Sequence, residues 1–117
     1  MISANMFNIQ TKTLELPGNV LSNTINFRVF ESAFIRAGRI AAAYLNIDAQ
    51  VIWFKAPNLV LGKGIFTAHL IVFDNFNCDC KNLTFNASQV EYRNMTQEQI
   101  YAVSNRVFDI TNISRLP

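Results

Sequence analysis

Apolar positions in the first half of the chain recur with the period of a helix. From Phe27 to Leu45 they return every three or four residues, which predicts an amphipathic helix with one apolar stripe. Asn26 is suited to cap the start of this helix, and arginines fall on its opposite side. The predicted stripe consists of Phe27, Phe30, Phe34, Ala37, Ala41, Tyr44 and Leu45.

A second helix is predicted near the end of the chain. Thr96-Gln97-Glu98-Gln99 has the form of a capping box, in which the threonine caps the helix and the glutamine three residues later reaches back. The apolar residues that follow would form the buried side of this helix. They are Ile100, Val103, Val107 and Ile110.

The other apolar segments predict β-strands. Residues 7–16 and 20–25 flank Pro17-Gly18, a pair suited to a type II turn, and so predict a hairpin. Three further strands are predicted by their β-branched and aromatic content or by alternation, at residues 50–55, 65–74 and 83–92. Because residues 65–74 are apolar at odd and even positions alike, we expect a central strand covered on both faces.

These elements follow the order ββ-α-βββ-α. The order predicts an α+β fold, with an antiparallel sheet of four to five strands covered by two amphipathic helices. The length of 117 residues fits a single domain spanning 1–117, and we identify no internal repeat or linker. From residue 27 onward the order of elements resembles that of the double-stranded RNA-binding domain. The lysine-rich helix start with which that family grips phosphates is here Thr96-Gln97-Glu98-Gln99, so the resemblance covers topology alone.

The composition is unusually apolar for so short a chain. Half of the residues are hydrophobic, 15% are charged and ten are phenylalanine. Such a surplus predicts exposed apolar surface that a partner or a second copy covers, although a well-packed monomer is the alternative. We therefore expect a homo-oligomer or another protein partner. The expected interface comprises Trp53, Phe54, Phe66 and Phe73.

Charge adds a second hypothesis. The net charge is +2 and the isoelectric point is about 8.7, a mild bias that neither requires nor excludes nucleic acid. Arg28, Arg36 and Arg39 fall on one side of the predicted first helix, where they could contact phosphates. A solvated helix face explains the same arginines, and so small a net charge favours that interpretation.

The third hypothesis is a metal or redox site. Cys78 and Cys80 flank a single aspartate, and His69 is the one histidine of the chain. A structural zinc site usually needs a second ligand pair, which the sequence lacks, and a Cys78–Cys80 disulfide would be strained. We therefore interpret residues 75–82 as a turn, and His69 as a residue of the core or of an interface.

No catalytic motif accompanies these residues. Gly62-Lys63-Gly64 lacks the frame of a phosphate-binding loop and predicts a turn between strands. The sequence thus favours a small regulatory or accessory binding protein without catalytic activity or cofactor. The start of the chain lacks the pattern of a signal peptide, and its longest uncharged apolar stretch, Ile65 to Phe73, is too short to span a membrane. These features predict a cytoplasmic protein that does not bind membranes.

Overall fold

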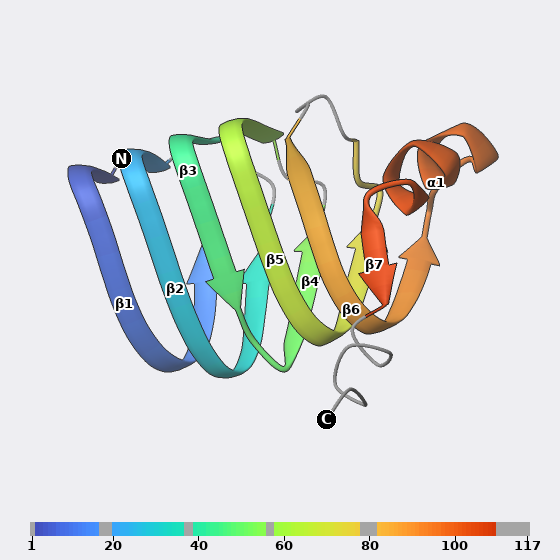
Figure 1. Ribbon diagram of the computed structural model, residues 1–117, viewed down its shortest axis with the longest axis horizontal. Helices are drawn as coiled ribbons and strands as arrows, with labels where there is room; N and C mark the ends of the chain where they lie inside the picture. Colours follow the sequence, from blue (N-terminus) through green and yellow to red (C-terminus); the bar gives the residue numbers. More distant parts are fainter. Residues whose placement is uncertain (1, 17–19, 37–38, 56–57, 78–81, 110–117) are drawn as a thin grey trace.

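In the computed structural model the chain is a β-solenoid, in which a bent chain winds into stacked coils (Figure 1). The structure describes residues 2–16, 20–36, 39–55, 58–77 and 82–109, and every strand pairing among them is parallel. The strands are β1 (Ile2–Leu16), β2 (Val20–Ile35), β3 (Arg39–Asp48), β4 (Val51–Lys55), β5 (Asn58–Asp74), β6 (Leu83–Arg93) and β7 (Val107–Asp109). One short helix, α1 (Gln97–Ser104), lies between β6 and β7.

Each coil has two walls joined at a sharp corner. The chain descends one wall, bends, and returns along the other, so that long strands such as β2 and β5 belong to both walls (Figure 1). We call the part before the corner the first wall and the part after it the second wall. The second wall consists of residues 13–16, 32–35, 51–55, 70–74 and 89–93.

The coils are stacked in register with a constant spacing on the second wall. Ile35 pairs with Phe54, Phe54 with Phe73, and Phe73 with Tyr92, so equivalent positions recur every 19 residues. Neighbouring strands in a sheet lie about 4.8 Å apart, which places these four side chains in one column. The sequence therefore contains a repeat that the sequence analysis missed.

The corner changes which positions of the chain face inward. On β5 the buried side chains are Phe66 and Ala68 before the corner, but Ile71 and Phe73 after it, so the inward positions pass from even to odd. His69 lies at this corner, and its backbone N–H donates to the carbonyl of Gln50 at 3.0 Å. The equivalent Gln50 N–H donates to Glu31 at 3.0 Å, which stacks successive corners on one another.

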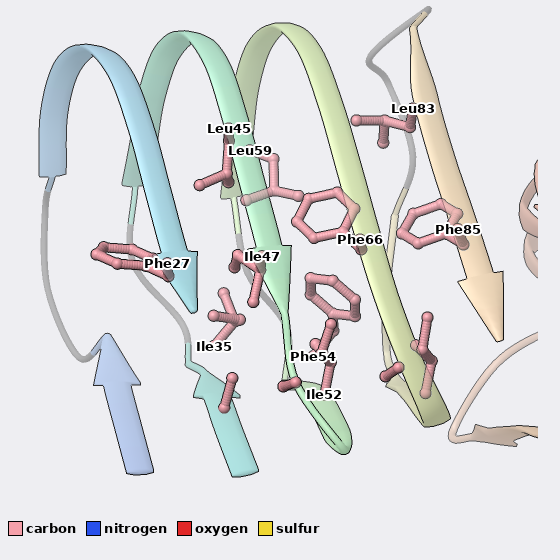
Figure 2. Packing of buried hydrophobic residues seen from close by; sticks show 14 of the residues in the cluster. Phe27, Ile35, Leu45, Ile47, Ile52, Phe54, Leu59, Phe66, Leu83 and Phe85 are labelled. Carbon is pink, nitrogen blue, oxygen red and sulfur yellow. The ribbon is translucent and has the colours of Figure 1, made fainter. Parts of the chain in front are cut away.

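The core between the walls is a cluster of phenylalanine rings. The ring centroid of Phe54 lies between 5.0 and 5.9 Å from those of Phe66, Phe73, Phe76 and Phe85. These distances fall in the range that favours edge-to-face and offset-stacked pairs. Figure 2 shows Phe54, Phe66 and Phe85 converging between the walls from three successive coils.

The two ends of the solenoid differ. After β6, Thr96 and Gln99 form the capping box that begins α1, and the buried Val103 packs on the core. The side-chain amide of Gln99 also donates to Asn77 at 2.6 Å, which ties α1 to the segment after β5. At the other end, β1 pairs with β2 on one edge and with no described strand on its other edge. No described helix is long and apolar enough to cross a membrane.

The predicted α+β fold is wrong, because the described residues contain a parallel sheet and one helix. The first predicted helix is occupied by β2 and β3. Inward side chains on β2 are two residues apart along each wall but four apart across the corner, from Val29 to Ala33. This mixture of intervals resembles a helical period, although β-branched residues such as Val29 and Ile35 favour strands.

The antiparallel pairing and the central strand are also wrong. Pro17-Gly18 lies outside the described residues, but the strands on either side of it pair in parallel, so they form no hairpin. Gly62-Lys63-Gly64 lies within β5 and is not a turn. The apolar residues at odd and even positions of 65–74 reflect the corner at His69, and not a strand covered on both faces.

Three predicted elements are confirmed. Strands occupy most of 50–55, 65–74 and 83–92, as β4, part of β5, and β6. The second helix begins after the predicted cap, Thr96, but it ends at Ser104, and Val107 belongs to β7. Ile110 lies outside the described residues.

The stacking of coils predicts a specific coupling between two positions. A Cβ atom added at Gly64 would lie 2.7 Å from Leu83 Cδ2, in the next coil. Gly64→Ala should therefore lower the free energy of unfolding by about 1–2 kcal/mol through overpacking. In the Gly64→Ala/Leu83→Ala double variant the clash is absent, so urea denaturation should give a loss smaller than the sum of the two single losses. Strictly additive losses would contradict the stacking of Gly64 on Leu83.

Candidate binding surface on the second wall

The outward side chains of the second wall form a column of aromatic and apolar residues. In register, Glu15 pairs with Phe34, Phe34 with Trp53, Trp53 with Val72, and Val72 with Glu91. An acidic residue thus stands at each end of the column, and two aromatic residues stand near its middle. Since strands alternate inward and outward, the neighbours of Trp53 in sequence, Ile52 and Phe54, are buried in the core.

Trp53 is held between an aromatic ring and a cation. The ring centroids of Phe34 and Trp53 are 6.3 Å apart, and the Arg93 guanidinium carbon lies 4.8 Å from the centroid of the Trp53 ring. That second distance is within the range of a cation–π interaction. Arg93 also donates to Glu91 at 3.1 Å, so its position is fixed from two sides.

This contact explains why Val72 is buried on an outward-facing position. Arg93 is two coils away from Trp53, and its side chain must cross the coil of Val72 to reach the indole. Val72 is only 1% exposed, yet it is not part of the core cluster between the walls. Trp53 and Arg93 therefore form a small layer of packing on the outside of the solenoid.

A pocket opens beside this layer. It is lined by Phe34, Arg36, Trp53 and Lys55 and has a volume of about 150 Å³. Arg36 directly follows β2, and its Nε lies 2.7 Å from Glu15 Oε1. The pocket therefore combines an aromatic base with a basic rim.

Positive and negative charges balance on this surface. The second wall and the residue that follows β2 carry three basic and three acidic outward side chains. They are Arg36, Lys55, Arg93, Glu15, Asp74 and Glu91. Four of these six form ion pairs with one another, Arg36 with Glu15 and Arg93 with Glu91. The surface thus offers aromatic area and local charges without a net positive field.

The three arginines of the predicted basic helix face do not share one surface. Arg28 lies on the first wall, in register with Asp48, and Arg39 begins β3 on the same wall. Arg36 stands beside Glu15 on the second wall. The arrangement expected for phosphate binding depended on the helix, and the strands place its members on two different walls.

The predicted interface residues divide between the core and the surface. Phe54, Phe66 and Phe73 are fully buried in the core, where they contact one another. Trp53 alone of the four lies on the outer surface, next to the exposed Phe34. Its Nε1 atom is buried and has no hydrogen-bond acceptor among the described residues.

The candidate metal ligands are not brought together by the described residues. His69 is exposed at the corner between the walls and not in the core. Cys78 and Cys80 lie outside the described residues. Within residues 2–16, 20–36, 39–55, 58–77 and 82–109, no group of three histidine, cysteine, aspartate or glutamate side chains could hold a metal ion.

Sequence reasoning missed Phe34, Lys55 and Arg93 as members of one surface. The signal was present in the spacing, since Phe34 and Trp53 are 19 residues apart, as are Arg36 and Lys55. Tyr92, beside Arg93, faces the core side and stacks on Phe73 with centroids 5.7 Å apart. Burial raises the pKa of the Tyr92 phenol above its ordinary value, so that residue stays neutral at physiological pH.

Comparison with known proteins adds no relative to this description: no family model, curated protein or solved structure matches the chain. The fold itself defines the class, a small parallel β-solenoid with one aromatic and basic pocket on its second wall.

The unpaired indole N–H makes the stability of Trp53 variants predictable. A buried donor without an acceptor costs about 1–3 kcal/mol, and Trp53→Phe removes it while keeping an aromatic ring over Val72. We expect the free energy of unfolding of Trp53→Phe to remain within about 1 kcal/mol of the wild type, or to rise. Trp53→Ala should be less stable than Trp53→Phe by about 1–2 kcal/mol, because it also uncovers Val72. Equal losses in urea denaturation would show that the ring does not cover Val72.

Proposed function

We propose that this chain is a binding protein that recognises a protein partner through the outer surface of its second wall. The observation that carries the proposal is the array of Phe34, Trp53 and Arg93, held on a rigid sheet beside an open pocket. Tryptophan and arginine are enriched among the side chains that dominate protein–protein affinity. The stacked coils fix these side chains in position before a partner arrives, which lowers the entropic cost of binding.

The charges of this surface favour protein over nucleic acid. A nucleic-acid site gains affinity from several unopposed cations, each of which neutralises a phosphate. Here Arg36 and Arg93 already pair with Glu15 and Glu91, so a polyanion along the column would meet acidic groups at both ends. A protein partner can match alternating charges around an aromatic centre.

A cytoplasmic location and the absence of a catalytic step belong to the same proposal. Support for the location is the cysteine usage: two thiols separated by one residue do not form an unstrained disulfide, and reducing compartments preserve free thiols.

A capture experiment with matched surface variants tests the proposal. The immobilised wild type, Phe34→Ala, Trp53→Ala and the control Val60→Ser are exposed to lysate of the native organism, and bound proteins are identified by mass spectrometry. Val60 is a suitable control because it is 46% exposed, against 39% for Phe34, and lies on the first wall. One defined protein should bind the wild type and Val60→Ser, and its affinity should fall at least about 30-fold for Trp53→Ala.

Two results would contradict the proposal. If the partner binds Trp53→Ala as well as wild type, the second wall is not the binding surface. If nuclease treatment removes the captured material, and binding weakens steeply with salt, the ligand is a nucleic acid.

The open end of the solenoid supports self-association as a second property. The far edge of β1 presents unpaired backbone groups, which favour the addition of another strand. Charged side chains often protect such edges, but Lys12 and Glu15 are directed to β2, where they pair with Glu31 and Arg36. Light scattering should show a mass that rises from 13.3 kDa to about twice that value with concentration. A mass of 13.3 kDa at every concentration would exclude the dimer.

A further inference from the structure

The pocket on the second wall has the size of one side chain. Its volume of about 150 Å³ is comparable to that of cavities that hold a single benzene ring. Phe34 and Trp53 provide the apolar surface against which such a group can pack, and the pocket opens to solvent between Arg36 and Lys55. The shape therefore fits one apolar or aromatic group, and not an extended polymer.

The charges around the pocket leave one cation for a ligand. Arg36 lies 2.7 Å from Glu15, and Arg93 is engaged by Glu91 and by the Trp53 ring. Lys55 is exposed and forms no ion pair or hydrogen bond with any of the described residues. A single uncompensated ammonium beside an apolar pocket is complementary to a ligand with one negative charge next to an apolar group.

We propose that this pocket takes one apolar side chain of the protein partner, with an adjacent carboxylate of the same polypeptide bound by Lys55. The inference rests on the proposed function and names the chemistry that the partner must present. A carboxylate fits better than a phosphate, because phosphate groups are best recognised by unpaired arginines, and the two arginines of this surface are occupied. The partner segment therefore carries an aromatic or large aliphatic residue directly beside an acidic group or a C-terminus.

Trp53 reports on this pocket directly, because it is the one tryptophan of the chain. Its fluorescence is followed while the wild type is titrated with N-acetylphenylalanine and, separately, with the uncharged N-acetylphenylalaninamide. The carboxylate probe should bind about tenfold more tightly than the amide, the difference expected for one charge-assisted contact. Lys55→Met should bind both probes equally, at the affinity of the amide. The conservative variant Lys55→Arg should retain the preference for the carboxylate.

Three results would overturn the inference. No saturable fluorescence change with either probe would mean that the pocket does not accept the side chain. Equal binding of the two probes by the wild type would remove the carboxylate. Tighter binding of adenosine monophosphate than of the carboxylate probe would assign the pocket to a nucleotide.

The probe titration and the capture experiment fail independently. If the captured partner still depends on Trp53 while neither probe binds, the proposed function survives and the pocket is not the contact. If the carboxylate probe binds as expected while capture is insensitive to Trp53, the pocket binds a small acid and the proposed protein partner is contradicted.

Discussion

The stacking of phenylalanine rings across coils is the interaction on which the rest of the structure depends. Phe54 contacts rings from the coils on either side of it and from the segment after β5, so it joins the two walls into one core. Burying one such side chain contributes about 1.5–3 kcal/mol, and the pairing of rings adds to this. Parallel pairing in register keeps the rings in one column, because each coil repeats the same inward positions.

The same register also builds the outer surface. Once Ile35, Phe54 and Phe73 are stacked inside, their neighbours Phe34, Trp53 and Val72 are necessarily stacked outside. The contact between Arg93 and Trp53 then spans two coils and fixes the indole over Val72. A binding surface on a β-solenoid is thus a consequence of its repeat, since an outward residue gains a partner whenever the next coil carries a suitable side chain at the same position.

The sequence predicted local elements better than their arrangement. Alternation and β-branched residues were sufficient for β4 and β6, and the capping box at Thr96 was sufficient for the start of α1. The corner was not predicted, because it shifts inward positions from even to odd and makes β2 resemble a helix. Parallel pairing could not be inferred either, since it depends on contacts between residues 19 apart, and the repeat is carried by side-chain character and not by identity.

The candidate site shows the same limit at the level of single residues. Trp53 was expected on the surface together with Phe54, but adjacent residues of a strand face opposite ways, so one is outside and the other inside. Arg36 was expected to face solvent on a helix, and its pairing with Glu15 in the neighbouring coil requires the parallel register. Lys55 and Arg93 carried no signal along the sequence, because their role arises only when coils are stacked.

The register is tested most directly by nuclear magnetic resonance on protein with labelled isoleucine methyl groups. Ile52 and Ile71 are 19 residues apart, both are buried, and they are paired on neighbouring strands of the second wall. A strand spacing of about 4.8 Å predicts a strong nuclear Overhauser effect between their methyl groups, together with the backbone pattern of parallel strands. The absence of that contact, or an antiparallel backbone pattern across residues 51–55 and 70–74, would contradict the stacked solenoid.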